Sequence, residues 1–401
     1  MPERDALPRQ LELPGVEAEE RPAPQQSTGA TTGNMNDEEL AHWLVFTRVR
    51  GIGPARFQKL LDFFGDAATA WRGGQDDLLA AGLDARTTQS LLAQRKATPD
   101  ALRELELLAR HNITALPLPD PAYPALLREI YLPPSLLYLR GTLTAADEWA
   151  ISIVGTRKAT AYGLQATNKL AGDLAQQQIT IISGLARGID TAAHQAALTA
   201  GGRTIAVLGC GLDIVYPPEN AKLAARIVEQ GALVSEFPLG TKPEASNFPA
   251  RNRIISGLSR GVLVIEAPLN PPSGALITTR FALDQNRDVF ALPGSIFSRA
   301  SDGTNKLIQD GAKLVMQATD ILEDLQMQQA PQQQAMREHL PASNTEGVIL
   351  ALLAAAPEPL HSDEICRATG LPASEVSGAL LMMHLKGMIV DLGSMRYARV
   401  R

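Results

Sequence analysis

Short apolar runs rich in β-branched residues alternate with segments of helical pattern between residues 150 and 325. The runs are continuously apolar and do not alternate with polar residues, which is typical of strands covered on both faces. A repeated strand–helix order predicts a doubly wound α/β domain around a mainly parallel sheet. The expected strands are Ile151–Val154, Ile179–Ile182, Thr204–Leu208, Leu233–Ser235, Val262–Ile265, Val289–Ala291 and Lys313–Val315. A ligand is then expected at the carboxyl ends of the strands, where the strand order reverses.

The rest of the chain divides by composition into further segments. They are a leader at 1–36, a helical segment at 37–110, a Pro-rich connector at 111–149, a Gln-rich linker at 326–344 and a C-terminal segment at 345–401. The leader has no apolar stretch, so we expect a disordered segment and not a signal peptide, with Met35 as a second candidate start of translation. The connector carries several aromatic residues, which favours an ordered segment. The C-terminal order of three helices and a hairpin predicts a winged helix.

The helical segment contains Gly51-Ile52-Gly53 between two short apolar helices. This arrangement is similar to a helix-hairpin-helix or SAM-like domain, in which glycines bring backbone N–H groups close to a DNA phosphate. A small helical bundle in which the glycines only form a tight turn explains the pattern equally well. Four basic residues near the turn favour phosphate contact: Arg48, Arg50, Arg56 and Lys59.

The formal net charge of −6 argues at first sight against a nucleic-acid partner. Residues 1–40 hold nine acidic and three basic residues, however, and account for the whole excess. DNA binding by the nearly neutral remainder depends on where its basic side chains lie. The two cysteines, Cys210 and Cys366, have no neighbours at metal-ligand spacing, which argues against a disulfide framework or a zinc site and fits a cytoplasmic protein. No apolar run is long enough to predict a membrane-spanning helix.

Glycine-rich loops follow the first two expected strands of the α/β segment. Gly155-Thr156-Arg157 lacks the Gly-x-Gly-x-x-Gly spacing of dinucleotide sites, but its N–H groups and its arginine suit an anion. The loop at 183–190 offers Ser183 and Gly184 in the same way, with Asp190 orienting the loop. We expect His194 to be a packed helical residue, and Cys210, which has no basic partner nearby, to be a buried thiol and not a nucleophile.

The densest basic cluster is Phe248-Pro249-Ala250-Arg251-Asn252-Arg253. An aromatic ring beside cations suits single-stranded nucleic acid, because a base stacks on the ring and the cations contact the backbone. In the competing interpretation Phe248 is a core residue and one arginine pairs with Glu236 or Glu244. We expect at least one of the arginines to be structural. Ser273-Gly274 supplies another helix N-terminus at the same edge.

A hydrolase is the alternative function. Glu266 ends the strand before Ser273-Gly274, where a nucleotide or nucleoside-phosphate hydrolase of related architecture would place a catalytic acid. Thr278 and Thr279 stand where such an enzyme would need an acid, which weakens this alternative, and no nucleophile set or P-loop lysine occurs elsewhere. We therefore predict a protein that is not an enzyme and has no cofactor or metal.

Several motifs in series closely resemble the DNA-processing protein family DprA, also called Smf. They are Gly155-Thr156-Arg157, the loop at 183–190, Gly209-Cys210-Gly211-Leu212-Asp213 with Tyr216-Pro217, the cluster at 248–253 and Ser301-Asp302-Gly303-Thr304-Asn305. The resemblance implies an extended Rossmann fold and a homodimer that binds single-stranded DNA, protects incoming strands during natural transformation and helps load the recombinase RecA.

By position, the resemblance also implies site residues. The DNA contacts that it implies are Arg157, Ser183, Gly184, Phe248, Arg251 and Asn252. The loop N-termini described above add Thr156, Ser273 and Gly274. Some relatives carry a lysine shortly before the phenylalanine; here the nearest is Lys242, which we include. The expected dimer surface contains Leu283, Leu307 and Ile308. The C-terminal segment is about neutral and its expected recognition helix carries few base-reading side chains, so we predict a protein-interaction or accessory role for it.

Overall fold

The structure is a computed structural model that describes residues 35–98, 100–326, 344–356, 359–385, 388–393 and 395–399. The predicted leader, apart from Met35 and Asn36, and most of the predicted linker lie outside these residues. Among the residues described, no helix is both long enough and apolar enough to cross a membrane.

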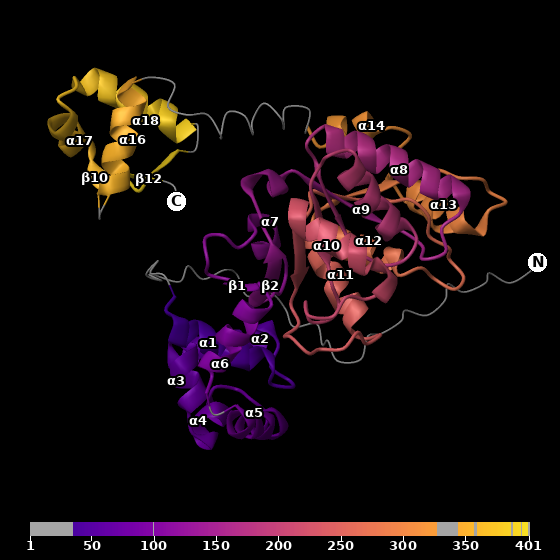
Figure 1. The fold of residues 1–401 in the computed structure, drawn as a ribbon, viewed down its shortest axis with the longest axis horizontal. Helices are drawn as coiled ribbons and strands as arrows, with labels where there is room; N and C mark the ends of the chain where they lie inside the picture. The colour runs from indigo at the N-terminus through magenta and orange to yellow at the C-terminus, as the bar shows by residue number, and fades with distance from the viewer. Residues whose placement is uncertain are drawn as a thin grey trace, which may run out of the picture. The chain divides into compact units, whose positions relative to one another are not determined.

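The N-terminal region contains six helices within the described residues (Figure 1). They are α1 (Asp37–Thr47), α2 (Pro54–Phe64), α3 (Ala67–Arg72), α4 (Gln75–Ala80), α5 (Ala85–Ala97) and α6 (Leu102–Arg110). Edge-to-face aromatic contacts form its core, with ring centroids 4.8 Å apart for Trp43 and Phe57 and 5.2 Å apart for Phe46 and Trp71. The side chains of Asp66 and Asp84 cap α3 and α5 by accepting from backbone N–H groups.

Two of the four basic residues near the Gly51–Gly53 turn are used within the protein. Arg48 forms a 2.7 Å ion pair with Glu104, and its guanidinium also donates to the Leu239 carbonyl. Arg56 donates to the Gly51 carbonyl, at 2.7 Å, and pairs with Asp84. These contacts stabilise the turn and favour the interpretation as a helical bundle.

A nine-stranded sheet forms the centre of the α/β region, in the order β1-β2-β6-β5-β4-β3-β7-β8-β9. The strands are β1 (Thr114–Pro117), β2 (Leu136–Gly141), β3 (Ala150–Val154), β4 (Thr180–Ser183), β5 (Thr204–Val207), β6 (Gly231–Ser235), β7 (Gly261–Val264), β8 (Asp288–Ala291) and β9 (Lys313–Leu314). Strands β3 to β9 are parallel. All seven predicted strands are present, and the doubly wound fold is confirmed.

The connector contributes the two strands that the sequence analysis did not predict. Strand β1 pairs antiparallel with β2, and β2 pairs antiparallel with β6, so the connector extends one side of the sheet. Tyr123 and Tyr138 are fully buried, as expected of an ordered segment, whereas Tyr131 is exposed. The Tyr123 hydroxyl donates to the Pro134 carbonyl at 2.8 Å, which ties the loop before α7 (Ala125–Arg128) to the loop after it.

Helices cover both faces of the sheet. One apolar core joins α8 (Ala161–Gln176), α9 (Ile189–Thr199) and α14 (Ala318–Asp324) to the sheet. The other joins α7, α11 (Asn247–Gly257) and α12 (Ala275–Asp284) to the opposite face. The remaining helices are α10 (Ala221–Gln230), which packs on β5 and β6, and α13 (Asp302–Gln309), which packs on β8. Three short 3-10 turns are also present, η1 (Ala145–Glu148), η2 (Pro218–Asn220) and η3 (Arg299–Ser301).

The C-terminal residues that the structure describes form a winged helix, as predicted. Its elements are α16 (Asn344–Ala355), β10 (Leu360–His361), α17 (Ser362–Thr369), α18 (Ala373–Leu385), β11 (Ile389–Asp391) and β12 (Arg396–Arg399). The strands form a small antiparallel sheet in the order β10-β12-β11. Ile349, Ile365, Val376 and Met383 are buried in a core of its own.

Candidate nucleic-acid interface

A cleft of about 890 Å³ opens where the strand order of the sheet reverses. Strand β3 lies between β4 and β7, so the loops after β3 and β7 leave the sheet in opposite directions and leave a crevice between them. The cleft is lined from three sides by Gly155, Thr156, Arg157, Lys158, Tyr216, Phe248, Arg251, Asn252, Ser273 and Gly274, among others. Seven of these ten residues were predicted contacts, and only Gly155, Lys158 and Tyr216 were not; Gly155 and Tyr216 belong to motifs that the sequence analysis described.

The loop after β3 presents Arg157 to solvent at the rim of the cleft. The Thr156 N–H donates to the Glu266 carbonyl at 2.8 Å, which fixes this loop against the end of β7. Gly155 is required because a Cβ atom there would lie 2.6 Å from the Ile189 side chain. Arg157 and Lys158 are exposed, and neither has an acidic partner among the described residues. The two cations are therefore available to an anion.

Phe248 lies at the centre of a cluster of aromatic and cationic groups. The Arg157 guanidinium carbon lies 5.4 Å from the Phe248 ring centroid, and that of Arg251 lies 5.9 Å from it. The Tyr216 ring lies 5.8 Å away, tilted by 37°. Phe248 is half-buried and lines the cleft, so part of its ring faces the open space. This geometry differs from a core phenylalanine and offers a surface on which a flat group can stack.

Arg251 is only 4 % exposed and holds the loops of the cleft together. Its guanidinium donates to the carbonyl oxygens of Gly184 and Val207 at the ends of β4 and β5, and to the Asn252 side chain. Burial lowers the pKa of Arg251 to about 10, while the nearby Asp190 carboxylate opposes that shift. Arg251 remains charged at neutral pH and acts chiefly as a structural cation beneath Phe248.

Burial raises the pKa of Asp190, whereas Arg251 and two backbone N–H groups lower it. Those N–H groups belong to Gly184 and Ala186, at 3.2 and 3.3 Å from the carboxylate. The carboxylate thus orients the loop after β4, as the sequence predicted. Its donors are the same loop N–H groups that were expected to contact a phosphate, so they are already used within the protein.

The second arginine of the cluster is also structural. Arg253 pairs with Glu236 and donates to the Leu132 carbonyl, at 2.6 Å, which confirms that one arginine is used in an ion pair. Burial raises the pKa of Glu236, and Arg253 acts in the opposite direction. Asn252 lines the cleft with its amide donating to the Gly274 carbonyl at 3.3 Å, which links α11 to the start of α12.

Three predicted contacts lie apart from the main cleft. The Ser183 side chain is fully buried and its hydroxyl donates to the Ile153 carbonyl at 2.6 Å, so this hydroxyl is not available to a ligand. Gly184 lines a small adjoining pocket with Arg157, Tyr216 and Phe248. Lys242 is exposed and lines neither cavity.

The geometry around Glu266 does not suit an acid–base catalyst. Glu266 is 1 % exposed, and its carboxylate accepts hydrogen bonds from the backbone N–H and the hydroxyl of Thr160. A Cβ atom at Gly163 would lie 2.4 Å from the same carboxylate. Glu266 therefore anchors the start of α8, and the cleft is lined by Ser273 and Gly274 and not by this acid.

Neither His194 nor Cys210 is placed for chemistry. Burial lowers the pKa of His194 to about 3, so its ring is neutral, and Nδ1 lies 2.7 Å from the Thr204 hydroxyl. Burial raises the pKa of Cys210 to about 11, and its thiol donates to the Ile214 carbonyl. Both outcomes agree with the sequence analysis. In the part of the chain that the structure describes, no three His, Cys, Asp or Glu residues are grouped as metal ligands require.

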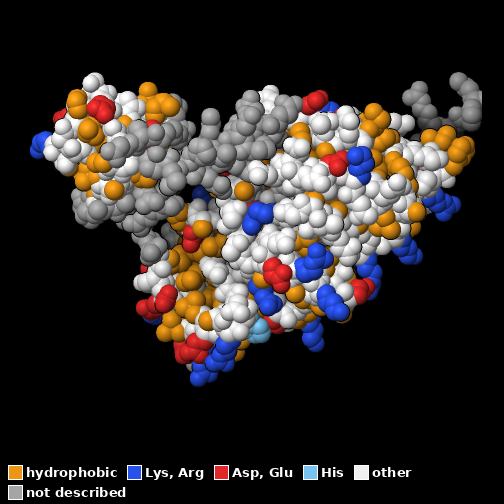
Figure 2. Space-filling view, turned by 45° about the horizontal axis from the view of Figure 1, so that its top comes forward, with side chains coloured by type: hydrophobic (Ala, Val, Ile, Leu, Met, Phe, Trp, Pro, Cys, Tyr) orange, Lys and Arg blue, Asp and Glu red, His pale blue; other side chains and the backbone are white. Residues whose placement is uncertain are grey.

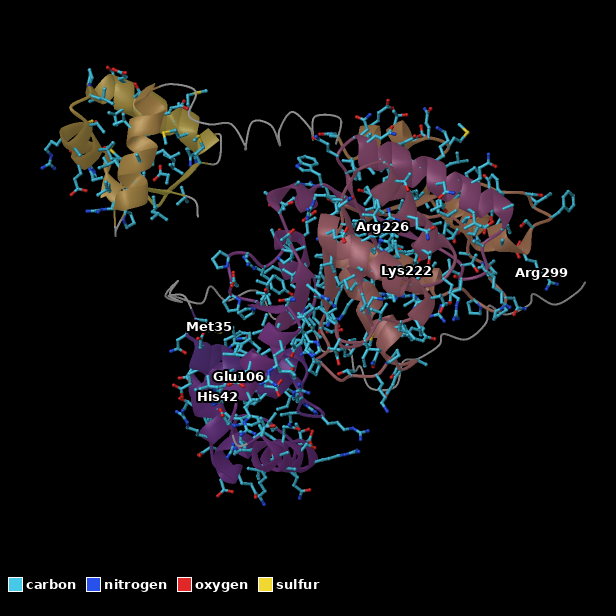
Figure 3. The ribbon with its side chains drawn as sticks, in the orientation of Figure 1. Met35, His42, Glu106, Lys222, Arg226 and Arg299 are labelled. Atoms are coloured by element: carbon cyan, nitrogen blue, oxygen red, sulfur yellow. The ribbon has the colours of Figure 1, made fainter. Side chains whose placement is uncertain are left out.

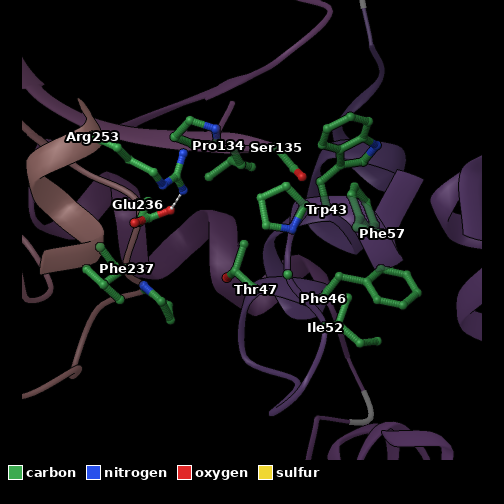
Figure 4. Close-up of a pocket in the computed structure, with 15 residues that line it drawn as sticks. Trp43, Phe46, Thr47, Ile52, Phe57, Pro134, Ser135, Glu236, Phe237 and Arg253 are labelled. Atoms are coloured by element: carbon green, nitrogen blue, oxygen red, sulfur yellow. Dashed lines mark hydrogen bonds and ion pairs between the residues drawn. The ribbon is translucent and has the colours of Figure 1, made fainter. Parts of the chain in front are cut away.

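A second, smaller cavity of about 280 Å³ lies between α1, α2 and the end of β6 (Figure 4). Its walls are mainly apolar, from Trp43, Phe46 and Phe57 on one side and Phe237 on the other. The Arg253–Glu236 ion pair closes one end of it (Figure 4). The aromatic rings on the helical side are themselves buried, so their faces are occupied by neighbouring rings.

The comparisons with known proteins agree with the motifs. The family profile described as DNA recombination-mediator protein A matches residues 114–326, and a DprA winged helix domain profile matches residues 330–394. Protein Smf of Synechocystis is 37 % identical over 403 residues, which cover 91 % of this chain and 100 % of that protein. Protein Smf of Escherichia coli is 42 % identical, covering 80 % of this chain and 86 % of its own length.

A solved structure matches the fold as well. The X-ray structure of DNA processing protein A from Streptococcus pneumoniae superposes with a TM-score of 0.61 and 35 % sequence identity. The superposition covers 72 % of this chain and 98 % of that one. The first family profile begins at the connector strand β1, which agrees with the place of the connector in the sheet. The chain therefore belongs to the DprA/Smf family of DNA-processing recombination mediators and carries the winged helix of that family.

Proposed function

We propose that the protein binds single-stranded DNA in the cleft without sequence preference and acts as a mediator, not as an enzyme. The exposed Arg157 beside the half-exposed ring of Phe248 carries this proposal. Every base has a flat face, so stacking on Phe248 is independent of sequence, while Arg157 and Lys158 contact the backbone. The biological role, by resemblance, is to protect incoming strands in transformation and to help load the recombinase RecA.

Two basic side chains of the cleft support binding, although the chain as a whole carries a formal net charge of −6. Figure 2 shows Lys and Arg side chains spread over the visible face and not gathered in one patch. Arg251 donates to the Gly184 carbonyl and Arg253 pairs with Glu236, so neither is free to bind a ligand. Among the described residues, the exposed cations that line the cleft are Arg157 and Lys158. The hydrolase alternative is not favoured, because Glu266 is buried and occupied by Thr160.

A comparison of single- and double-stranded DNA of one sequence tests this function. The full chain is expected to bind the single strand more tightly, since a duplex does not present base faces to Phe248. Affinity should fall as the salt concentration rises, because the arginine and lysine side chains displace counterions from the DNA phosphates, and this release is less favourable at high salt. Equal affinity for the duplex, or release of base or phosphate from added nucleotides, would contradict the proposal.

We also propose a homodimer. Of the three residues expected at its interface, Leu283 is the most exposed. Leu283 on α12 is 62 % exposed, while Leu307 and Ile308 on α13 are half-buried and Leu307 packs partly against the core. Glutamate at position 283 should leave the fold intact but place a charge in the apolar contact. We expect Leu283→Glu to elute as a monomer in size-exclusion chromatography with light scattering. Leu102→Glu, at an exposed leucine on α6, is the control; a dimeric Leu283→Glu protein would place the interface elsewhere.

A further inference from the structure

The loop between β8 and α13 exposes two large apolar side chains. Phe297 is 93 % exposed and Ile296 is 79 % exposed, although burying a phenylalanine ring would stabilise the fold. The Ser298 N–H donates to the Ser295 carbonyl, at 3.0 Å, and the Phe297 N–H to the Ser295 hydroxyl, at 3.2 Å, so the tip is a hydrogen-bonded turn. An ordered turn that presents an aromatic ring to solvent is typical of a contact site for another molecule.

The base of this loop belongs to the cleft. Asn305 on α13 bonds to both the N–H and the carbonyl of Gly294, at 3.1 and 3.0 Å, which fixes the start of the loop. At its end, the Ala267 N–H donates to the Ala300 carbonyl at 2.8 Å. Ala300 itself lines the cleft. The exposed ring therefore stands three residues from the wall of the cleft, at the same carboxyl edge of the sheet as Phe248.

Charge indicates what this loop contacts. Arg299 lies two residues from Phe297, is exposed, and has no acidic partner within the described ranges. Figure 3 shows Arg299 at the outer margin of the α/β region. The segment from Gly294 to Ser301 contains no acidic residue. The loop thus carries an aromatic ring and a free guanidinium two positions apart in sequence, the same two group types that Phe248 and Arg157 supply in the cleft.

We infer that Phe297 and Arg299 form a second stacking position for the same DNA strand, beyond Phe248 and across the cleft. This inference rests on the proposed function. Bases that leave the cleft stack on Phe297, and Arg299 contacts the backbone there. The occupant is single-stranded DNA and not a protein, because Ile296 and Phe297 stand between two serines beside the free Arg299, in a segment without acidic residues.

The length dependence of binding separates this second position from the first. Thymidine oligonucleotides of increasing length are titrated into wild type and Phe297→Ala. Wild type should gain affinity once the strand is long enough to reach Phe297, whereas Phe297→Ala should bind short strands normally and lose the later gain, about tenfold in Kd. Tyr131→Ala removes an 81 % exposed aromatic that lines neither cavity, and it should behave as wild type at every length.

A fluorescent reporter provides the direct measurement. The three native tryptophans, Trp43, Trp71 and Trp149, are all buried, so Phe297→Trp adds an exposed one whose emission should fall when long strands bind. Unchanged emission with equal affinity of Phe297→Ala at all lengths would overturn the second position while leaving binding at Phe248 in place. If the Phe297→Ala variant were a monomer while wild type is a dimer, the loop would be a contact between protein subunits, and the second stacking position would also be overturned. Failure of wild type to bind any length would reject the proposed function itself.

Discussion

Arg251→Ala is expected to lower the free energy of unfolding by about 3–5 kcal/mol, because it removes one partner from a buried set of charges and polar groups. The carbonyl oxygens of Gly184 and Val207 lose their donor, and the buried Asp190 carboxylate loses its compensating cation. Urea unfolding of the full chain measures the loss. We also expect single-stranded DNA binding to fall, since the loops after β4 and β5 support the Phe248 ring.

The pH dependence identifies the cause of this loss. Without the guanidinium, burial raises the pKa of Asp190 further, so the folded variant takes up a proton at higher pH than the unfolded chain does. The destabilisation should therefore be largest near neutral pH and shrink as the pH falls. Asp190→Asn should recover part of the stability in the Arg251→Ala background. Arg226→Ala, at an exposed arginine on α10 (Figure 3), is the matched control and should change the free energy of unfolding little. If Arg251→Ala changed that free energy as little as Arg226→Ala does, Arg251 would not be a buried structural cation.

Phe248→Ala is expected to weaken single-stranded DNA binding by about 5- to 150-fold, which corresponds to the loss of one stacked base at about 1–3 kcal/mol. Stability should change far less, because the ring is half-buried. Arg157→Ala should weaken binding as well, and it should reduce the slope of log affinity against log salt by about 0.7, the contribution of one phosphate contact on a single strand. Fluorescence anisotropy over a salt series measures both quantities.

Conservative variants distinguish stacking from a general disturbance of the cleft. Phe248→Tyr keeps a stacking face and should retain most of the affinity, whereas Phe248→Leu keeps the bulk and should not. Lys169→Ala, at an exposed lysine on α8 away from the cleft, removes one positive charge and should leave the salt slope unchanged. Wild-type affinity in both Phe248→Ala and Arg157→Ala would refute the assignment of the cleft as the DNA site.

The sequence predicted the parallel strands correctly and missed the two connector strands for a clear reason. Strands β3 to β9 are mostly buried on both faces, which leaves a continuous apolar run in the sequence. Strands β1 and β2 lie at the side of the sheet among prolines, pair antiparallel, and give no strand–helix alternation. Strand β2 joins the sheet through β6, which lies far along the chain, so no local pattern shows that the connector belongs to the sheet.

The basic cluster shows the same limit within a single helix. Arg251 and Arg253 are two positions apart on α11, so their side chains leave the helix on different sides. One reaches the ends of β4 and β5, and the other reaches Glu236. The cluster correctly indicated the edge of the sheet that forms the cleft. Which cation faces solvent was decided by strands and loops distant in sequence.

The sequence by itself determined the doubly wound fold, the winged helix and the edge of the sheet where the motif loops meet, because hydrophobic period and loop chemistry are local properties. The tertiary structure alone decided which polar groups remain available. Ser183, Arg251 and Glu266 are desolvated and satisfied by partners far along the chain, and Asp190 is desolvated and satisfied within its own loop, while Arg157, Lys158 and Phe297 reach solvent. Burial and pairing arise only when separate segments pack together, and they separate the residues that build the cleft from those that remain free to contact a ligand.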